Sequence, residues 1–543
     1  MRGRDYKYIG STSIVISKRV GIRKTFLDIN MSSSIPLQQF YLKHPATLVD
    51  FGNALALLFI VALCYRVGLV VYRIFFHPLR AFPGPKLWAI TDLPYTYTSD
   101  ICGTSTHKIA EFHRKYGPAV RVGPDRIALD GIIGWPEVYA RRSGGDAEYE
   151  KAPRFFARGT EQAIISAHRD AHRRQRRQLG HAFSDAAMHE QEGIIIRYVQ
   201  LLVDRVQEHV DSGKTLNIVQ WLNFTTFDII GDMTYGESFG SLKSSNYHPW
   251  VLSIFEGIRA DAFIRACRNY PTFGPLVEML SRSTKGKENN ELAMMKGKAR
   301  MDLGIEPNGR RDFMSYMLKP TRDGDPGLSV IEAMSNCPLL VVAGSETTAT
   351  ALSGFFFYVN RTPRVKAFLM NEIRNAFQDE SEIDMVSTNN LEYLHATLEE
   401  TLRVYPPVAT TPPRTSPGAV IDGKYVPQGT VVHVSQWVTF RNPEHFLEPD
   451  SFCPERWLKN THPLYESKFA NDNHDVFKPF SHGPRDCIGK NLAYAEMRLI
   501  VSHLLYRFNF EVLPGQDDWH ATQNSYVVWE KGPLYIKFSA RGR

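Results

Sequence analysis

The stretch that decides the fold is Phe480–Gly489, which reads FSHGPRDCIG. Its glycines and proline predict a loop, and a helical pattern begins near Ile488. A thiolate at Cys487 would therefore lie at a helix N-terminus, where the helix dipole and unpaired backbone N–H groups stabilise negative charge. Arg485, two residues earlier, adds a fixed positive charge. The pattern favours a cysteine that ligates the metal of a carboxylate-bearing cofactor. The alternative is a small buried residue, the usual fate of a free cysteine.

Composition and charge exclude several classes of protein. The chain has 543 residues, of which 43% are hydrophobic and 22% are charged, unlike a disordered chain or a polytopic transporter. The 64 basic and 57 acidic side chains leave a net charge of +7, too weak an excess over this length to predict nucleic-acid binding. This charge suits a protein near anionic lipid or an acidic partner. The six cysteines form no Cys-x-x-Cys pair, so a reducing, cytosol-facing compartment is expected.

Helical patterns dominate the chain after about residue 87, with short strand-like runs between them. The clearest helical runs are residues 193–210, 334–359, 391–405 and 489–508, and the clearest strand-like runs are 119–123, 126–130, 429–436 and 533–538. No internal repeat recurs at a fixed period, which excludes a solenoid. The sequence therefore predicts one large compact unit that is mainly α with small β-sheets.

The FSHGPRDCIG motif resembles the haem-binding loop of the cytochrome P-450 (haem-thiolate monooxygenase) family. Phe480, Gly483, Arg485 and Cys487, with the glycine that ends the motif, occupy every fixed position of the family pattern FxxGxRxCxG. The resemblance covers nearly all of the chain from about residue 75 and implies the cytochrome P-450 fold, with a single large haem domain. It also implies haem b as the cofactor, with Cys487 as the axial ligand of the iron and Phe480, Gly483 and Arg485 as cofactor-binding residues.

A basic segment, HRDAHRRQRR at residues 168–177, is by composition a solvated helical face. The resemblance places His172 and Arg176 of this segment on the haem propionates, with His where the family usually has Trp. Arg414 is implied as a further propionate partner, because planar Arg forks match carboxylates bidentately. The other arginines of the segment are expected on the surface to which a reductase docks.

Residues 343–348, AGSETT, lie inside a long helical run. An acid followed by hydroxyls fits plain core packing poorly. The alternative is a threonine bonded back to the carbonyl four residues earlier, with Glu346 facing solvent. In the resembling family this segment crosses the distal face of the haem, and an acid–alcohol pair handles protons for oxygen activation. The resemblance therefore implies Glu346 and Thr347 as catalytic residues, with Gly344 allowing the cofactor to approach the backbone.

Glu400 and Arg403 form an ExxR pattern on a predicted helix, where positions i and i+3 share a face and can pair. Alone, such a pair is usually an ordinary surface salt bridge. The resemblance adds Arg456, in the PERW stretch at 454–457, as the third member of a buried structural network.

Residues 51–72, FGNALALLFIVALCYRVGLVVY, carry one charge and as a helix would span about 33 Å, enough for a hydrocarbon core. They predict one transmembrane anchor rather than a buried core helix, because they lack a polar stripe. Basic residues after this stretch predict a cytosolic catalytic domain, and the resemblance implies the endoplasmic reticulum membrane. The expected divisions are an N-terminal extension at 1–50 (of which 1–30 need not belong to the mature protein), the anchor at 51–72, a proline-rich hinge at 73–86 and the haem domain at 87–543.

The resemblance implies a monooxygenase that inserts one atom of O2 into an apolar substrate. It points to the fungal secondary-metabolism branch containing isotrichodermin and averantin hydroxylases, hence to a polyketide, terpenoid or alkaloid. No Rossmann fingerprint or flavin domain is seen, so electrons would come from NADPH through a separate cytochrome P-450 reductase, with cytochrome b5 as a further candidate partner. Family position implies substrate contacts at 155–165, 336–340, 408–411 and 526–529. Two alternatives stay open, a reductase-independent haem-thiolate isomerase or dehydratase and a non-catalytic haem-binding membrane protein.

Overall fold

The computed structural model describes residues 45–142, 147–153, 155, 162–275, 279, 284–320, 324 and 326–542. The expectations for residues 1–30, and the part of the expected substrate contacts at 156–161, lie outside the described residues. The chain divides into two compact units, Met1–Leu69 and Val70–Arg543.

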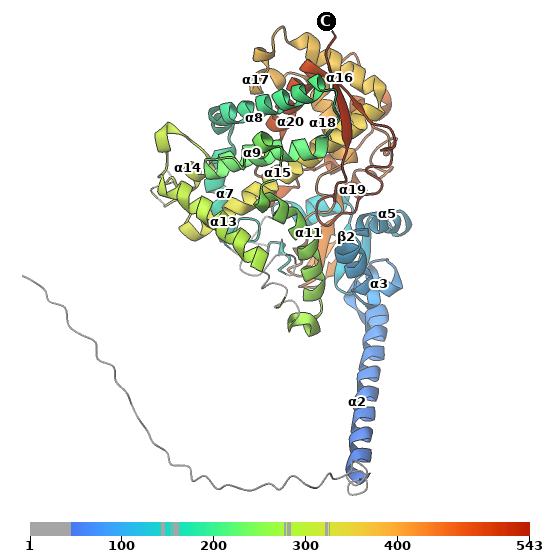
Figure 1. Ribbon diagram of the computed structural model, residues 1–543. Helices are drawn as coiled ribbons and strands as arrows, with labels where there is room; N and C mark the ends of the chain where they lie inside the picture. Colours follow the sequence, from blue (N-terminus) through green and yellow to red (C-terminus); the bar gives the residue numbers. More distant parts are fainter. Residues whose placement is uncertain are drawn as a thin grey trace, which may run out of the picture. The chain divides into compact units, whose positions relative to one another are not determined.

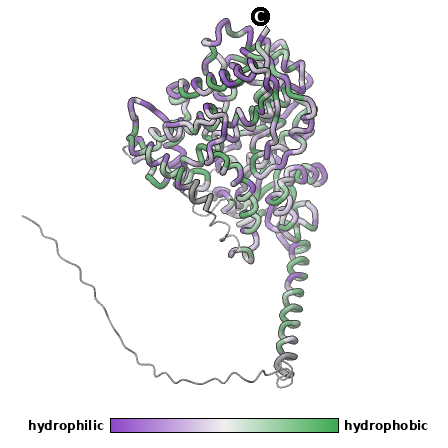
Figure 2. Tube along the Cα trace, in the orientation of Figure 1, coloured by the Kyte–Doolittle hydropathy of each residue, from purple (hydrophilic) through white to green (hydrophobic). Residues whose placement is uncertain are grey.

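Helix α2 (Pro45–Val71) makes up the described part of the first unit. Its side chains are predominantly apolar (Figure 2) and exposed from Asp50 to Gly68. The stretch Asp50–Phe76 is long and apolar enough to cross a membrane. Helix α15 (Val330–Arg361) passes the same test of length and composition, but most of it is buried within the second unit, as expected for a core helix.

Helices make up most of the second unit, and their apolar faces form its core (Figure 1). The longer ones, besides α15, are α5 (Ser105–Tyr116), α7 (Arg169–Gly180), α8 (Asp185–Asp211), α9 (Ile218–Tyr235), α11 (Pro249–Arg268), α13 (Thr284–Asp302), α16 (Pro363–Ala376), α18 (Glu392–Val404) and α20 (Lys490–Arg507). Shorter ones are α3 (Lys86–Ile90), α4 (Leu93–Thr96), α6 (Gly131–Gly134), α10 (Ser241–Ser244), α14 (Phe313–Leu318), α17 (Met385–Thr388) and α19 (Gln436–Thr439). The four helical runs predicted from the sequence fall on α8, α15, α18 and α20.

Three small sheets accompany these helices in the described part of the chain. The largest has the strand order β1-β2-β8-β5-β3, in which β2 and β8 are parallel and the other neighbours antiparallel. The others have the order β4-β10-β9 and β6-β7. The strands are β1 (Ala119–Gly123), β2 (Arg126–Leu129), β3 (Glu150–Lys151), β4 (Leu216–Asn217), β5 (Arg414–Thr415), β6 (Ala419–Ile421), β7 (Lys424–Val426), β8 (Val431–Val434), β9 (Phe508–Val512) and β10 (Tyr535–Ala540). The predicted fold class, mainly α with small β-sheets, is confirmed.

The packing of α9 against α15 forms the centre of the second unit. Nearly every residue of α9 is buried, because its sequence is apolar on most sides. Gly344 of α15 permits the contact, since a Cβ there would lie 2.7 Å from Cδ1 of Ile230 in α9. The sequence interpretation assigned Gly344 to the approach of a cofactor. The structure adds that a side chain at this position would have to displace the end of the Ile230 side chain.

Candidate active site

A cavity of about 300 Å³ lies between α15, the beginning of α20 and the loop that precedes α20. Its wall is mostly apolar and includes Phe183, Ile230, Leu340 and Met497. Segments far apart in the sequence meet here, so that the cavity is lined by the following residues predicted for the site: His172, Arg176, Thr347, Arg414, Phe480, Arg485 and Cys487. The structure therefore brings together most of the residues that the sequence singled out. We name this space the Cys487 cavity.

The loop before α20 aims Cys487 at this cavity. The turn Gly483–Arg485 tightens the loop, and the Cys487 backbone N–H donates to the carbonyl of Phe480 (2.9 Å). Gly483 has a φ of +79°, and a Cβ there would lie 2.0 Å from the carbonyl oxygen of Tyr139. Only glycine satisfies both conditions. The fixed Gly of the motif therefore serves the shape of the loop, and α20 begins three residues after Cys487, at Lys490.

The thiol of Cys487 is exposed only in the sense that it faces the interior cavity. Burial raises its pKa, and this effect outweighs a backbone N–H from Gly489 and the positive charge of Arg176, both of which lower the pKa. A thiol in such surroundings is protonated until a bound metal ion lowers its pKa and replaces the proton. The raised pKa therefore argues against a free thiolate nucleophile at Cys487.

Basic side chains gather on one side of the Cys487 cavity. Lys151, His172, Arg176, Arg414 and Arg485 all line it. Burial, and then the charges of the other four, lower the pKa of His172 to about 3, so its imidazole is neutral. Strand β3 pairs with β5 and sets Lys151 directly opposite Arg414. Burial, with the neighbouring arginines, holds the pKa of Lys151 well below its usual value.

Only part of this positive charge is neutralised by protein carboxylates. Arg176 donates to the backbone carbonyl of Asp486 and, at 2.5 Å, to its carboxylate. Arg485 contacts Glu148 (3.3 Å) and the carbonyl of Ala167 (3.0 Å). Arg414, by contrast, is buried with Nε and Nη1 lacking a hydrogen-bond partner among the described residues. Buried unpaired guanidinium groups require an anion. An apolar slot with a thiol on one side and cations at one edge fits haem, which carries two propionates.

Lys151 is a member of this cluster that sequence reasoning missed. It stands in a two-residue strand, and nothing in the local sequence marks it. Its register opposite Arg414 depends on a strand that lies more than two hundred residues further along the chain. Lys151 can therefore be identified only from the tertiary structure.

Thr347 presents its side chain to the Cys487 cavity together with Ala343 and Gly344, one turn earlier on α15. Its hydroxyl donates to the carbonyl of Ala343 (2.7 Å). This is the back-bonded threonine that the sequence left as an alternative. A back-bonded hydroxyl keeps its lone pairs free, so Thr347 can accept a hydrogen bond from a group in the cavity.

Glu346 does not line the Cys487 cavity. It is buried, it pairs with Lys531 from the loop before β10, and its Oε1 also lies 3.3 Å from the hydroxyl of Thr350. Its Oε2 has no hydrogen-bond partner among the described residues. Adjacent helix positions project about 100° apart, so the acid and the alcohol of this turn face different neighbours. The sequence had no signal for Lys531.

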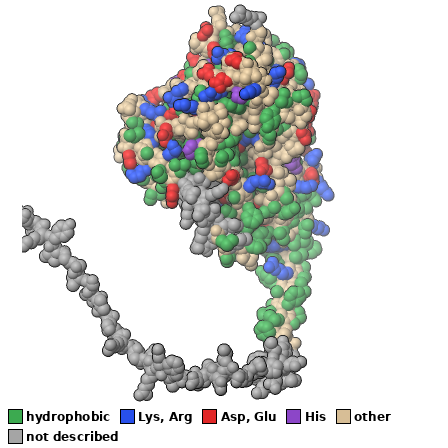
Figure 3. Space-filling view, viewed as in Figure 1, with side chains coloured by type: hydrophobic (Ala, Val, Ile, Leu, Met, Phe, Trp, Pro, Cys, Tyr) green, Lys and Arg blue, Asp and Glu red, His purple; other side chains and the backbone are tan. Residues whose placement is uncertain are grey.

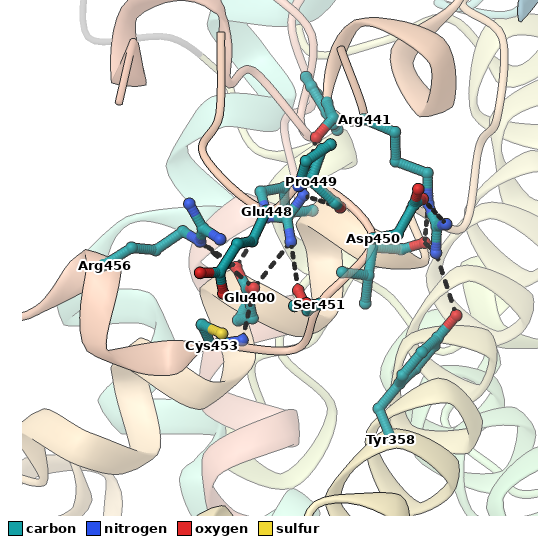
Figure 4. Close-up of polar contacts among 12 residues, drawn as sticks. Tyr358, Glu400, Arg441, Glu448, Pro449, Asp450, Ser451, Cys453 and Arg456 are labelled. Carbon is teal, nitrogen blue, oxygen red and sulfur yellow. Dashed lines mark hydrogen bonds and ion pairs between the residues drawn. The ribbon is translucent and has the colours of Figure 1, made fainter. Parts of the chain in front are cut away.

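Glu400, Arg403 and Arg456 meet in a fully buried network outside the cavity (Figure 4). Both nitrogens Nε and Nη2 of Arg403 lie 2.8 Å from the carboxylate of Glu400, and Arg456 approaches it at 3.3 Å. The backbone N–H of Cys453 and the indole N–H of Trp457 also donate to Glu400, at 2.8 and 2.9 Å. Burial alone would raise the pKa of Glu400, but the two arginines outweigh it and hold the pKa below 4.5.

The arginines of α7 divide between the interior and the surface. Arg174 pairs with Glu332 of α15, and Arg176 faces the Cys487 cavity. Arg169, Arg173, Arg174 and Arg177 are exposed, and Arg176 is half-buried. The helix therefore carries both a buried basic edge and an outward one, as its 3.6-residue period requires.

Some of the expected substrate contacts line one or other of two cavities, whereas Asn336, Cys337, Pro338, Ala409, Val528 and Trp529 line neither. Ile164, Ile165, Leu339, Leu340 and Val408 line the Cys487 cavity. Phe155, Thr410, Tyr526 and Val527 line a second cavity, and Thr411 lines both.

The sequence model of the Cytochrome P450 family matches residues 83–538, most of the chain. The chain therefore belongs to the cytochrome P450 family, whose cofactor is a haem iron with thiolate ligation. It is 40% identical over 478 residues to the cytochrome P450 monooxygenase astJ of Aspergillus oryzae, which covers 87% of this chain and 94% of that protein. It is 39% identical over 481 residues to the trichothecene C-15 hydroxylase of Fusarium sporotrichioides, which covers 87% and 96%.

A further relative is the averantin hydroxylase of Dothistroma septosporum, 39% identical over 495 residues that make up 88% of this chain and 90% of that protein. These comparisons confirm the family, the fungal branch and the class of enzyme predicted from the sequence. The chain is a monooxygenase, an oxidoreductase.

Proposed function

We propose that this enzyme hydroxylates an apolar polyketide, terpenoid or alkaloid, with electrons from NADPH delivered by a separate cytochrome P-450 reductase and with cytochrome b5 as a second candidate partner. The observation that carries the proposal is the Cys487 cavity, where a thiol, a cationic edge and an apolar wall line one space. Two relatives bear the names of hydroxylases, trichothecene C-15 hydroxylase and averantin hydroxylase, which supports both the reaction and the substrate class.

In this proposal Cys487 holds the haem iron, and His172, Arg176, Arg414 and Arg485 hold the propionates. Bound haem supplies the activation of O2 and the transfer of one oxygen atom to a C–H bond. Arg414 gains the anionic partner that its buried Nε and Nη1 lack. His172, being neutral, donates one ring N–H without adding charge. Phe480 and Gly483 shape the loop, and Phe480 also packs on the ring of Tyr494.

Thr347 and Glu346 are the proposed proton carriers. The Thr347 hydroxyl faces the cavity and holds a proton that it can donate after releasing the Ala343 carbonyl. Glu346 is the acid of the same turn. Lys531 occupies its Oε1, so Oε2 is the oxygen left to exchange a proton. The Glu400–Arg403–Arg456 network is proposed as structural, because none of its members lines the cavity.

We place the enzyme in the endoplasmic reticulum membrane through α2, with the catalytic unit facing the cytosol. Support comes from the apolarity of Asp50–Phe76 and from Arg80 and Lys86, which follow the span. Figure 3 shows hydrophobic side chains gathered around α3 on the surface of the second unit, where Leu87, Leu93 and Tyr97 are exposed. Exposed apolar clusters of this kind suit contact with lipid.

The test is turnover in microsomes that contain the full chain and a fungal cytochrome P-450 reductase. Extracts of secondary metabolites are incubated with NADPH under isotopically labelled O2, and products are scored by mass spectrometry for one labelled oxygen atom. The proposal expects labelled products that require both NADPH and the reductase. Products that form equally well without NADPH would favour an isomerase or dehydratase, and unlabelled products would overturn oxygen insertion.

A further inference from the structure

A second cavity of about 640 Å³ adjoins the Cys487 cavity, and its lining is rich in hydroxyl, amide and charged side chains. It draws its residues from β2, β8 and β5, from the helical turns after residue 92 and from the loop before β10. Thr411 lines both spaces. We name it the polar cavity.

The chain from Thr410 to Thr415 forms the wall between the two cavities. Thr411, Pro413 and Thr415 line the polar cavity, whereas Pro412 and Arg414 line the Cys487 cavity. Thr410 also lines the polar cavity, and the alternation from Thr411 to Thr415 follows from the extended backbone, in which successive side chains point to opposite faces. Thr411 is the residue of this segment that lines both spaces, the apolar one that contains the thiol and the polar one that does not.

The charges in the polar cavity offset one another. Asp100 and Arg265 form a buried ion pair at 3.0 Å. Asp125 lies 3.1 Å from His77, and the guanidinium of Arg126 stacks on the ring of Tyr95, 4.1 Å from its centroid. The described lining residues include two arginines against three aspartates, so the cavity presents no surplus positive charge to an anion. Its chemistry suits a neutral polar ligand.

His433 of β8 is the most informative group in this wall. It is 1% exposed, and neither ring nitrogen has a hydrogen-bond partner among the described residues. Burial, and then Arg126, lower its pKa to about 3, so the ring is neutral and offers one donor and one acceptor. Thr415 also lines the cavity, and its hydroxyl lacks a partner among the described residues. Buried polar groups without partners are costly unless something in the cavity satisfies them.

We propose that the polar cavity binds a neutral oxygen-bearing group of the substrate, a hydroxyl or a lactone or ketone carbonyl, through His433 and Thr415, while an apolar part of the same molecule extends into the Cys487 cavity. The inference rests on the proposed function and narrows it. The substrate is an amphipathic molecule that already carries oxygen, rather than a plain hydrocarbon. An earlier step, an oxygenation or a polyketide-type assembly, must have supplied that group.

The experiment compares three probes with one terpenoid chain and different ends: farnesene (hydrocarbon), farnesol (neutral hydroxyl) and farnesoic acid (carboxylate). Dissociation constants for the haem-loaded full chain in lipid nanodiscs are measured by isothermal titration calorimetry, without NADPH or reductase. The wild type is expected to bind farnesol about tenfold more tightly than farnesene, the effect of one satisfied buried hydrogen bond.

Replacement of His433 by a ring of similar shape removes both nitrogens. In His433→Phe the ratio of the farnesene to the farnesol dissociation constant should fall to about one. His433→Gln keeps a neutral donor and acceptor and should retain most of the wild-type ratio. Thr415→Val, an isosteric change on the neighbouring strand β5, should reduce the preference several-fold and provides a second test if His433→Phe fails to fold. The matched control is His107→Phe, a histidine that does not line the polar cavity.

Three results would overturn the inference. Equal affinity of the wild type for farnesol and farnesene excludes a neutral polar subsite. If farnesoic acid binds most tightly of the three probes, the polar cavity binds an anion and Arg126 is the group that recognises it. A farnesol preference that survives in both His433→Phe and Thr415→Val removes these residues from recognition. The calorimetry measures binding and requires no turnover. Its results can therefore be interpreted even if the enzyme does not insert oxygen as proposed.

Discussion

Lys531 and Glu346 form an ion pair in the core of the second unit, with side chains that are only 3% and 4% exposed. Lys531 comes from the loop before β10, and its ammonium also lies 2.6 Å from the hydroxyl of Thr350 on α15. The pair joins the C-terminal loop to the helix turn that carries Thr347. It also holds the acid of that turn on a face that does not line the Cys487 cavity.

We expect Lys531→Met to lower the free energy of unfolding by about 3–5 kcal/mol, because it leaves the Glu346 carboxylate buried without a counter-charge. The double variant Lys531→Met/Glu346→Gln should recover much of this loss, since a neutral amide needs no partner ion. Denaturant unfolding of the haem-loaded variants measures both. The control is Lys459→Met, whose pair with Glu392 is exposed and should change stability by less than about 0.5 kcal/mol. If Lys531→Met has the same free energy of unfolding as the wild type, the ion pair contributes nothing to stability.

Cys487→Ser should abolish the CO difference spectrum that is characteristic of thiolate-ligated haem. The hydroxyl of serine is a weaker ligand than a thiolate, while the apolar wall and the cationic edge stay in place. Cys453→Ser is the matched control, because Cys453 is buried beside Glu400 and its contact there is through the backbone N–H. The measurement is the CO difference spectrum of each reduced variant, compared with that of the wild type. A serine variant at 487 that keeps the wild-type band would refute the ligand assignment.

Thr347→Ala should uncouple the reaction: NADPH consumption continues, product formation falls and peroxide rises. The change removes the hydroxyl that faces the cavity and leaves the helix turn otherwise intact. Thr347→Ser retains a hydroxyl and should restore much of the coupling. The readout is the ratio of product to NADPH consumed. Unchanged coupling in both Thr347→Ala and Glu346→Gln would remove these residues from proton delivery.

The stability of the Glu400 network should depend on pH in the acid range. Arg403 and Arg456 outweigh burial and hold the pKa of Glu400 below its usual value of 4.5 in the folded protein. A carboxyl with a depressed folded pKa contributes stability above its unfolded pKa, and this contribution is lost as the pH falls through the folded pKa. The loss should therefore begin below about pH 4.5.

Glu400→Gln isolates this contribution. It should be less stable than the wild type by about 3–5 kcal/mol at neutral pH, because Arg403 then lies buried without its anion. The difference between the two proteins should shrink as the pH is lowered, which urea unfolding at a series of pH values would follow. The control, Glu111→Gln, removes an exposed carboxylate and should track the wild type. A difference that stays constant with pH would contradict the lowered pKa.

Arg173→Glu/Arg177→Glu should slow the first electron transfer from the reductase and flatten its dependence on salt. Both arginines are exposed on α7, and neither lines the Cys487 cavity. Exposed charges act mainly on the rate of encounter, and salt screens them over about 8 Å at physiological strength. Stopped-flow reduction at low salt is the measurement.

Haem content and the CO spectrum should survive this double change, because the residues that line the cavity are untouched. The control is Arg114→Glu/Lys115→Glu, an equal change of charge on exposed positions of α5. Reduction at the wild-type rate at low salt would show that the basic face of α7 is only a solvated surface.

Much of this enzyme is determined by short-range sequence. The loop around Cys487 is specified by residue types at fixed spacing, since Gly483 must adopt a positive φ against Tyr139 and the cysteine must precede a helix. The ExxR pair is specified by helix geometry, which sets positions 400 and 403 on one face. The long helices follow from their hydrophobic period, so the fold class and the ligand loop are both predictable.

Only the tertiary structure decided the surroundings of these motifs. Lys151 joins the cationic edge because β3 pairs with β5, Lys531 reaches Glu346 because the C-terminal loop packs on α15, and His433 faces a cavity because β8 borders the wall at Thr410–Thr415. The physical reason is common to all three. The pairing of distant segments depends on how helices and sheets pack as a whole, and no local spacing records which side chain will meet which.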